Sequence, residues 1–385
     1  MIVKHLELVD FRNHSNTNLD FQPGTTILVG QNGQGKTNLV EAIRFISTLG
    51  SHRVAGYLPL IQNGKPQAVI RALVGVDNRE VSVELELNRE GQNRASVNRS
   101  KSNKFRDVLG LVTTVTFAPE DLDIVKRDRS NRRDFVDELV IQAIPRLAGI
   151  YSDYNRVLKQ RNSLLKSARQ TKTTGTALST LDAWDEQLVK LGSEIIANRV
   201  ALIAKLEPYV YAAYQAIATS NNEPKLTIES SVLAASFDED EDELPSLITS
   251  DRDEIEAMFH AKLAEVRKKE LERGLTLIGP QRDELRIELG AMPAKGYASH
   301  GESWSLALAL RLGSVELLKE NGNTGDPILI LDDVFAELDD ERRSRLAQMV
   351  KLNEQVLITA AVANDVPSAL KAQKFKVTRG VVTVG

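Results

Sequence analysis

The chain contains no cysteine and no long apolar run, and each absence excludes a class of protein. None of its 385 residues is a cysteine, which excludes disulfides, thiolate zinc sites and cysteine nucleophiles, and fits a reducing compartment. No stretch reaches the roughly 18 consecutive apolar residues that a membrane-spanning helix requires. The N-terminal sequence MIVKHLELVD alternates apolar and polar side chains instead of forming the apolar run of a signal peptide. We therefore expect a cytoplasmic protein.

The length and the composition indicate a folded protein with more than one structural part. At 385 residues the chain is longer than one ordinary domain, so we expect two domains or a large domain with an insertion. Hydrophobic residues make up 42% of the chain and charged residues 26%. This mixture is typical of globular proteins and excludes a disordered polymer or a fibre.

Charge is unevenly distributed along the chain, although the net charge is only −4. Segment 94–106 holds five basic residues and no acid, and segment 126–133 holds five basic residues against the single Asp128. Six consecutive carboxylates occupy 238–243, and we expect this self-repelling block to form an exposed loop. The two basic runs are therefore the segments to consider for a nucleic-acid partner.

Hydrophobic periodicity divides the chain into three segments. The first alternates like strands, the second has helical spacing, and short strands return at 275–279, 283–289, 326–332 and 355–359. We predict one domain built from both ends of the chain, residues 1–125 and 273–385, and an inserted helical domain at 126–272. Prolines should interrupt the helices of the insertion and keep its arm short, at Pro145, Pro208 and Pro224.

A phosphate-binding loop follows the buried strand predicted at 25–30. The sequence GQNGQGKT at 30–37 fits the pattern G-x-x-x-x-G-K-[ST] and opens a helical segment. Glycines let backbone N–H groups turn toward phosphate oxygens, Lys36 adds positive charge, and the Thr37 hydroxyl can ligate Mg²⁺. This segment therefore predicts a nucleotide-binding site with Mg²⁺. Its predicted nucleotide-binding residues are Gly30, Asn32, Gly33, Gly35, Lys36, Thr37 and Asn38.

Two adjacent carboxylates end the apolar run PILILDD at 327–333. A phosphate-binding loop needs an acid across the site to hold the metal, and we assign Asp332 to Mg²⁺ together with Thr37. Asp333 would then face the γ-phosphate, where a carboxylate can orient or deprotonate the attacking water. We predict Asp333 and Lys36 as the catalytic residues. The long stretch of chain between them makes small GTPases and nucleotide kinases poor fits.

A second anion contact is predicted where a helix begins near residue 300. Ser299 and Gly301 precede the apolar helical run LALALRLGSVELL, with Glu302 beside them. The unpaired N–H groups and the dipole of a helix N-terminus favour an anion, so this segment is a candidate for a second phosphate contact.

The order of these motifs resembles that of ABC-type ATPase heads. The chain has a phosphate-binding loop, then a Ser-x-Gly before a helix, then the Asp332-Asp333 pair. Glu-Leu-Asp339 comes shortly after that pair. Across nearly the whole chain, further segments resemble the RecF recombination-mediator family. These are FRNH at 11–14, APEDL at 118–122, RRDFVD at 132–137, VLKQRNSLLK at 157–166, GPQRDE at 279–284 and LDDVFAELD at 331–339.

The resemblance implies a fold, an activity and partners. The implied fold is an α/β ABC-type ATPase head, a P-loop nucleotide-binding fold with an antiparallel β lobe and an inserted helical arm. The implied protein is a bacterial, cytosolic, nucleoid-associated, DNA-dependent ATPase that forms a homodimer on ATP. It would bind duplex DNA near single-strand gaps and work with RecR and RecO to help load RecA.

Motif positions carry further roles over from the family. Arg12 and Asn13 look like the nucleotide-contacting segment before the phosphate-binding loop. Ser299, Gly301 and Glu302 resemble the signature that closes over the ATP of the opposite subunit, and Asp339 resembles the loop at the dimer seam. Both features imply a two-fold dimer with two enclosed nucleotides.

The chain departs from the family pattern at three places. Glu302 stands where such signatures more often carry glutamine, which puts a carboxylate near the phosphates. The GPQRDE segment has Gln281 and Glu284 where histidine and aspartate are expected, so we assign it no catalytic role. Ala360 and Ala361 follow the last predicted buried strand, with no histidine to sense the γ-phosphate, and we expect slow hydrolysis.

DNA contacts are predicted in the second basic run, which contains no aromatic residue and therefore favours backbone phosphates over stacked bases. The candidates are Lys126, Arg127, Arg129, Arg132 and Arg133. For Arg132 and Arg133, pairing with acids inside the fold is an open alternative. Two alternatives stay open, namely the head of another SMC-like chromosome ATPase and a transporter's ATPase subunit. The five histidines show no ligand spacing, and we assign them no chemistry.

Overall fold

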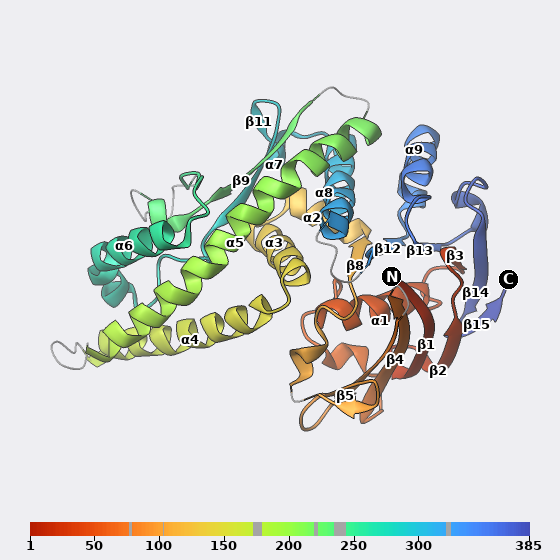
Figure 1. Cartoon of the computed structure of the whole chain (residues 1–385), viewed down its shortest axis with the longest axis horizontal. Helices are drawn as coiled ribbons and strands as arrows, with labels where there is room; N and C mark the ends of the chain where they lie inside the picture. Colours follow the sequence, from red (N-terminus) through yellow and green to blue (C-terminus); the bar gives the residue numbers. More distant parts are fainter. Residues whose placement is uncertain (77–78, 103, 172–178, 219–221, 235–243, 321–324) are drawn as a thin grey trace. The chain divides into compact units, whose positions relative to one another are not determined.

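The computed structural model describes residues 1–76, 79–102, 104–171, 179–218, 222–234, 244–320 and 325–385 (Figure 1). The acidic block predicted to be an exposed loop, 238–243, lies outside the described residues. The chain folds into two compact units. The P-loop unit comprises Met1–Asp123, Tyr209–Asn221 and Ser299–Gly385, and the inserted unit comprises Ile124–Pro208 and Asn222–Ala298.

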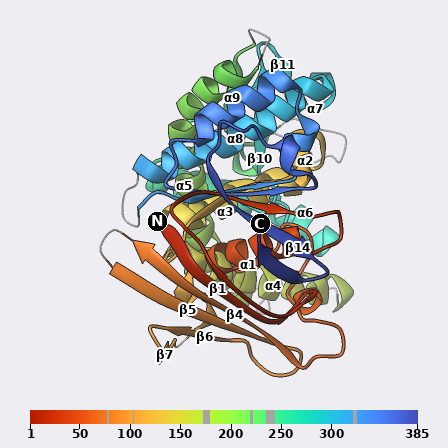
Figure 2. The same cartoon turned by 90° about the vertical axis from the view of Figure 1, so that its right-hand side faces the viewer.

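An antiparallel sheet forms one layer of the P-loop unit (Figure 2). Its strands alternate in burial, as Leu6 and Leu8 on one strand and Val83 and Leu85 on another are fully or almost fully buried between more exposed neighbours. This is the half-exposed sheet that the sequence predicts. In spatial order its strands are β2 (His14–Asp20), β1 (Ile2–Phe11), β4 (Gln67–Val76), β5 (Arg79–Asn88), β6 (Arg94–Val97) and β7 (Ser100–Lys101).

A second, mainly parallel sheet brings the two ends of the chain together. The strand before the phosphate-binding loop, β3 (Gly24–Val29), pairs in parallel with β13 (Gln355–Ala360) on one side and β14 (Ala372–Thr378) on the other. Strands β12 (Ile328–Asp332) and β13 are buried at every residue and β3 at Thr26–Leu28, which explains their unbroken apolar runs. In spatial order the strands are β15 (Val381–Val384), β14 (Ala372–Thr378), β3 (Gly24–Val29), β13 (Gln355–Ala360), β12 (Ile328–Asp332) and β8 (Thr114–Phe117).

The described helices that lie wholly in the P-loop unit include α1 (Lys36–Thr48), α8 (His300–Glu320) and α9 (Asp340–Val350). Helix α8 buries nearly all of its residues from Ser303 onward, which agrees with its apolar run. Its Trp304 ring meets the ring of Phe117 edge to face at 5.0 Å, and its Arg311 pairs with Asp121 at 2.6 Å. These contacts hold the first half of α8 against the end of β8 and the turn that follows it.

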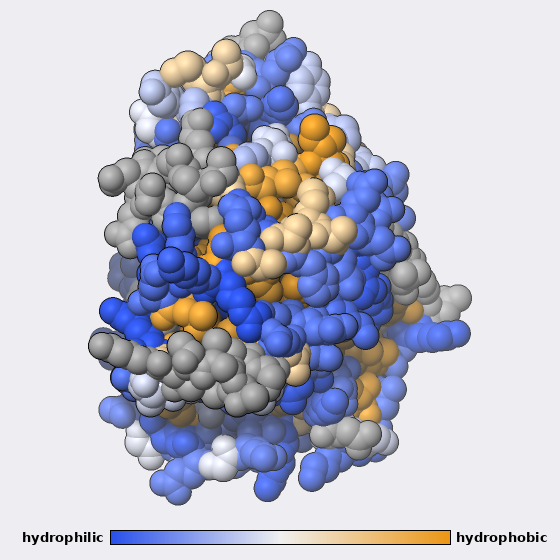
Figure 3. All heavy atoms as spheres, turned by 90° about the vertical axis from the view of Figure 1, so that its left-hand side faces the viewer, coloured by the Kyte–Doolittle hydropathy of each residue, from blue (hydrophilic) through white to orange (hydrophobic). Residues whose placement is uncertain are grey.

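The inserted unit is built from long helices and a small sheet. Its helices are α2 (Leu122–Lys126, which begins at the unit boundary), α3 (Arg129–Ala143), α4 (Leu147–Thr171), α5 (Ser179–Ile217), α6 (Arg252–Arg273) and α7 (Ala294–Tyr297). Arg161 of α4 joins three of them, because it pairs with Asp185 of α5 at 2.7 Å and with Glu270 of α6 at 2.6 Å. Figure 3 looks onto the end that carries α4 and α6, where hydrophilic side chains frame a narrow hydrophobic band.

Two details of the insertion differ from the sequence prediction. Pro208 does not break a helix, because it lies inside the 39-residue α5, whose last turns belong to the P-loop unit. The inserted unit also extends beyond the predicted boundary at residue 272, as far as Ala298. The reason is strand pairing, since β10 (Glu284–Leu289) pairs with β9 (Pro224–Glu229) and β11 (Met292–Pro293). Residues 275–279, predicted as a strand, are irregular and contain bends.

None of the helices in the described part of the chain is long and apolar enough to cross a membrane.

Candidate nucleotide-binding site

The phosphate-binding loop connects β3 to α1 as predicted, and its backbone leaves little room for side chains. Gly35 has a φ of 110°, and a Cβ there would lie 2.6 Å from Oδ1 of Asn13 and 2.8 Å from Nε2 of His14. Only glycine is compatible with this position. The loop is therefore held between the start of α1 and the turn after β1.

The Lys36 side chain folds back onto the phosphate-binding loop. Its side chain is almost fully buried, and its ammonium group donates to the Gln31 carbonyl oxygen at 3.4 Å. The same ammonium lies 3.9 Å from Oδ1 of Asp333. The two predicted catalytic residues thus lie together, although they come from opposite ends of the chain.

The predicted metal residues also meet. The Thr37 hydroxyl donates to Oδ1 of Asp332 at 3.0 Å. Thr359, at the end of β13, donates its hydroxyl to the same oxygen at 2.5 Å and accepts the backbone N–H of Asp333 at 2.9 Å. Sequence reasoning missed Thr359. The available signal was a polar residue at the end of the short apolar strand predicted at 355–359.

The two carboxylates differ in their electrostatics. Burial raises the pKa of Asp332, but His52 and the hydroxyls of Thr359 and Thr37 outweigh burial, so its pKa lies below the ordinary 3.8. Burial also raises the pKa of Asp333, and the opposing charge of Lys36 does not cancel it, so that pKa lies above the ordinary value. Asp332 is therefore the carboxylate better suited to bind a cation, and Asp333 is the stronger base of the two and better suited to accept a proton.

The turn after β1 packs against α1. The Arg12 guanidinium donates to both carboxylate oxygens of the fully buried Glu41, at 2.9 and 2.7 Å. Asn13 donates to the Gln34 carbonyl oxygen at 3.0 Å and accepts from the Asn38 amide at 2.7 Å. Arg12, Asn13 and Asn38 line one open pocket of about 620 Å³ together with Arg53, Leu58, Pro59, Ile61, Asn63 and Arg89.

Two histidines contribute to this site although sequence reasoning assigned them no chemistry. The buried His14 places Nε2 3.0 Å from the Gly35 carbonyl oxygen and Nδ1 3.0 Å from the Gly380 carbonyl oxygen. Burial lowers the pKa of His14 below 6.5 despite these backbone contacts. His52 places its Nε2 3.8 Å from Oδ2 of Asp332. Neither residue has a sequence spacing that identifies a ligand, because each reaches the site through the fold.

The predicted signature forms a capping box at the start of α8. The backbone N–H of Ser299 donates to Oε2 of Glu302 at 2.9 Å, and the N–H of Glu302 donates to Oγ of Ser299 at 3.3 Å. Asp339 caps α9, because its Oδ1 accepts the N–H of Arg342 at 2.8 Å. The Arg342 guanidinium also lies against Gly301, so the signature and the predicted seam loop are adjacent.

Comparison with known proteins identifies the family. A family model described as the RecF/RecN/SMC N terminal domain matches residues 2–383. The DNA replication and repair protein RecF of Streptomyces avermitilis is 51% identical, and the match covers 99% of both chains. The protein of the same name from Clavibacter michiganensis subsp. michiganensis is 52% identical over 99% of this chain and 96% of that protein.

The chain belongs to the RecF family. A solved structure of the recombination mediator protein RecF with ATP, in the RecFOR pathway, is 28% identical with a TM-score of 0.87, covering 100% of this chain and 97% of that one. An SMC head bound to the winged-helix domain of ScpA has a TM-score of 0.54 at 15% identity, covering 100% and 97%, and this likeness shows the fold alone. The α/β ATPase-head fold predicted from sequence is confirmed.

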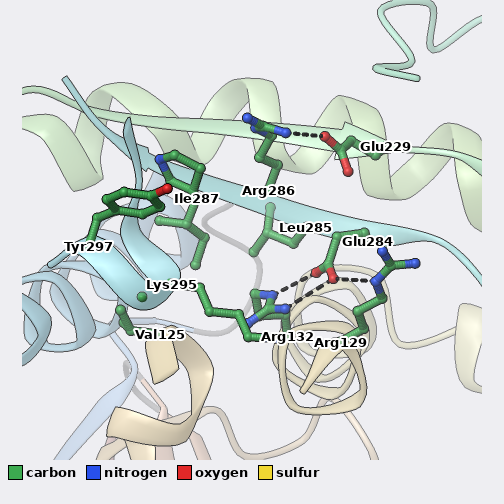
Figure 4. Close-up of a pocket in the computed structure, with 12 residues that line it drawn as sticks. Val125, Arg129, Arg132, Glu229, Glu284, Leu285, Arg286, Ile287, Lys295 and Tyr297 are labelled. Atoms are coloured by element: carbon green, nitrogen blue, oxygen red, sulfur yellow. Dashed lines mark hydrogen bonds and ion pairs between the residues drawn. The ribbon is translucent and has the colours of Figure 1, made fainter. Parts of the chain in front are cut away.

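The predicted DNA contacts of this RecF-family chain need a correction. Arg132 is buried and donates to both carboxylate oxygens of Glu284, at 2.6 and 3.0 Å (Figure 4). Arg129 lies 3.2 Å from the same carboxylate, and Arg133 donates to the Asp283 carbonyl oxygen at 2.9 Å. Arg132 is therefore an internal ion-pair residue and not a DNA contact. Lys126 and Arg127 lie on the surface.

Arg129 and Arg132 border a pocket of about 380 Å³ in the inserted unit, between α3 and the small sheet (Figure 4). Figure 4 shows Arg286 on the other side of this pocket, where it pairs with Glu229 at 3.1 Å. Burial raises the pKa of Glu229, and the Arg286 charge offsets only part of that rise. The pocket therefore alternates basic and acidic groups, which does not match the uniformly negative backbone of DNA.

The GPQRDE segment is structural in this RecF-family fold. Oδ1 of the buried Asp283 accepts hydrogen bonds from Ser230 and Ser231, and the Arg199 guanidinium donates to the Pro280 carbonyl oxygen at 2.7 Å. Gln281 accepts a hydrogen bond from the Tyr154 hydroxyl. The segment thus joins α4, α5 and the loop after β9.

Proposed function

We propose that the chain is an ATP-switched DNA-binding protein of replication and repair, as its RecF relatives are named. The observation that carries the proposal is the composite site in which Thr37 bonds Asp332 and Lys36 faces Asp333. In P-loop ATPases these residue types hold the metal, the phosphates and the attacking water. Their assembly from opposite ends of one RecF-type fold supports an ATPase head with an insertion.

The oxygen donors at this site suit Mg²⁺, which prefers hard ligands and is usually bound through one or two carboxylates and the substrate phosphates. We assign the metal to the Thr37 hydroxyl and the Asp332 carboxylate, as predicted from sequence. When bound, Mg²⁺ would neutralise charge on the β and γ phosphates. Lys36 would leave its contact with the Gln31 carbonyl oxygen to bind the same phosphates, and Asp333 would accept a proton from, or orient, the attacking water.

The signature is proposed to act across a homodimer. The capping box holds Ser299 and Glu302 at the N-terminus of α8, where N–H groups and the helix dipole favour an anion. Asp339 supports the same surface through Arg342. We propose that this surface closes over the ATP of the second subunit, and that slow, DNA-stimulated hydrolysis separates the two subunits.

The proposed nucleic-acid partner is duplex DNA near single-strand gaps, bound without sequence readout. The proposed protein partner is RecR, and RecO and RecA would act later. Lys126 and Arg127 remain candidates on the inserted unit, since both are exposed. The first basic run provides a second candidate surface on the P-loop unit, because Arg94, Arg99 and Lys101 are exposed on the β6–β7 edge. Surface cations of this kind contribute affinity by releasing counterions from DNA.

The test of the ATP switch is the molar mass in solution of the wild type, Lys36→Met and Asp333→Asn, each with and without Mg-ATP. Asp333→Asn should accumulate as an ATP-dependent dimer, because it retains the phosphate contacts and loses the proposed base. Lys36→Met should remain monomeric. If all three proteins stay monomeric at every ATP concentration, the two-subunit site is wrong.

The DNA surface is tested by the salt dependence of binding to gapped duplex. Replacing Lys126 and Arg127 together with glutamine should lower the slope of log affinity against log salt by about one for each phosphate contact removed. Arg146→Gln is the matched control, since Arg146 is an exposed arginine of the same unit that pairs with Glu194 at 2.6 Å. Equal slopes for both variants would exclude the Lys126–Arg127 surface.

A further inference from the structure

The loop that follows α1 is anchored back onto the helix that begins with the phosphate-binding loop. Ser51 donates its hydroxyl to Oε1 of Glu41 and accepts the backbone N–H of Arg53 at 3.0 Å. The Arg53 guanidinium donates to the Asn38 side-chain oxygen at 3.0 Å. Both neighbours of His52 are therefore fixed to α1, and this holds the imidazole between them toward the site.

Within the described part of the chain, the largely buried His52 has no hydrogen-bond partner. Only 9% of its side chain is exposed, and within the described residues neither ring nitrogen forms a hydrogen bond. Leaving a buried polar atom unsatisfied is costly, so such groups usually meet a ligand, water or ion. The free energy lost here would be recovered if a bound species supplied the missing partner.

The nearest charged group shows where such a partner would lie. Nε2 of His52 lies 3.8 Å from Oδ2 of Asp332, which is beyond direct hydrogen-bonding distance. The other carboxylate oxygen, Oδ1, already accepts the hydroxyls of Thr37 and Thr359. His52 therefore faces the oxygen of Asp332 that these hydroxyls leave open.

We propose that His52 is a positioning residue of the ATP site that hydrogen-bonds the water shell of Mg²⁺ beside Oδ2 of Asp332. Mg²⁺ dehydrates reluctantly and keeps several waters when proteins bind it, so its outer shell offers partners to nearby side chains. Residues that orient a metal ligand or its waters commonly tune metal affinity. The inference rests on the proposed function, because it requires Mg-ATP at this site.

The experiment measures the binding of a non-hydrolysable fluorescent ATP analogue as a function of Mg²⁺ concentration, and in EDTA. His52→Ala should weaken Mg²⁺-dependent binding by about three- to tenfold, the loss expected for one or two net hydrogen bonds. It should also raise the Mg²⁺ concentration for half-saturation and leave binding in EDTA unchanged. His52→Asn should recover part of the loss, because an amide can still bond water.

Controls separate this role from packing. His260→Ala, an exposed histidine on α6, should match the wild type in every arm. If His52→Ala fails to fold, His52→Phe keeps the ring volume without nitrogen and should show the same Mg²⁺-specific loss. An unchanged Mg²⁺ midpoint, or an equal loss with and without Mg²⁺, would overturn the proposal. If Lys36→Met also binds the analogue as the wild type does, the proposed ATP site itself is wrong.

Discussion

Replacing Arg132 with methionine should destabilise the inserted unit, because this arginine holds a buried carboxylate. Its guanidinium donates to Glu284 at 2.6 and 3.0 Å, and to the carbonyl oxygens of Arg127 at 2.9 Å and Ile124 at 3.3 Å. The side chains of Arg132 and Glu284 are only 6% and 8% exposed. Methionine preserves much of the apolar stem and removes every one of these hydrogen bonds.

The expected magnitude follows from what remains around Glu284. Removing one partner of a buried ion pair costs about 3–5 kcal/mol, since the other charge stays buried. Arg129 lies 3.2 Å from the same carboxylate and would retain part of the compensation. We therefore expect a loss of about 3 kcal/mol, at the lower end of that range. With a urea m-value of about 1–3 kcal/mol/M, the unfolding midpoint should fall by roughly 1–3 M.

The two tryptophans allow the units to be followed separately. The chain has two tryptophans, of which Trp184 lies on α5 in the inserted unit and Trp304 on α8 in the P-loop unit. In a Trp304→Phe background, Trp184 fluorescence should report the lowered midpoint caused by Arg132→Met. In a Trp184→Phe background, the transition reported by Trp304 should keep its midpoint.

Two further variants control this result. Lys126→Met changes an exposed cation nearby and should alter stability by no more than about 0.5 kcal/mol. The double variant Arg132→Met, Glu284→Met should recover most of the stability, because an apolar pair can replace a buried ion pair at little cost. The reasoning is refuted if Arg132→Met leaves the Trp184 transition unchanged and weakens DNA binding instead.

Three other predictions concern the ATP site and the inserted unit. Glu302→Gln should tighten the ATP-dependent dimer by about fivefold, because it removes a carboxylate close to the phosphates, and an exposed charge pair contributes up to ~1 kcal/mol. Sedimentation measures the dimer dissociation constant, and an unchanged constant would place Glu302 away from the phosphates. Burial lowers the pKa of His14 in the folded P-loop unit below the ordinary 6.5. Below pH 6.5 the unfolded chain therefore binds a proton that the folded unit resists, and the stability of the unit should fall as the pH is lowered from 6.5 through the folded-state pKa. Trp304-monitored unfolding should show this slope in the wild type, and His14→Gln should lack it. Gly279→Ala should lower the free energy of unfolding of the inserted unit by about 1–3 kcal/mol, because φ is 118° at Gly279 and a Cβ would lie 2.6 Å from the Tyr154 hydroxyl. An unchanged midpoint of the Trp184-monitored transition would exclude this strain.

Local sequence patterns predicted the parts of the site that depend on neighbours in the chain. The phosphate-binding loop needs glycines, Lys36 and Thr37 within one turn, and these residues are contiguous. The Asp332-Asp333 pair ends an apolar run, and a buried strand explains both features. The capping box of Ser299 and Glu302 is likewise local.

The missed residues depend on contacts that no local pattern contains. Thr359 reaches Asp332 because β13 lies between β3 and β12, an order that sequence spacing does not reveal. His52 reaches the site through a loop anchored by Ser51 on Glu41. Arg132 was assigned to DNA with the other cations of its basic run, because cations neutralise backbone phosphates, and its partner Glu284 lies far away in the sequence. Tertiary pairing decided each case.

The strand order also explains why the chain can carry its insertion without disturbing the ATP site. Strand β3, from the N-terminal segment, lies between β13 and β14 of the C-terminal segment. The phosphate-binding loop at its end is therefore supported on both sides by residues that follow the insertion in sequence. His14 reinforces this join, because its ring touches both Gly35 in the loop and Gly380 near the C-terminus. The ATP site contains residues from both ends of the chain, so it can form only when strands from the two ends have paired.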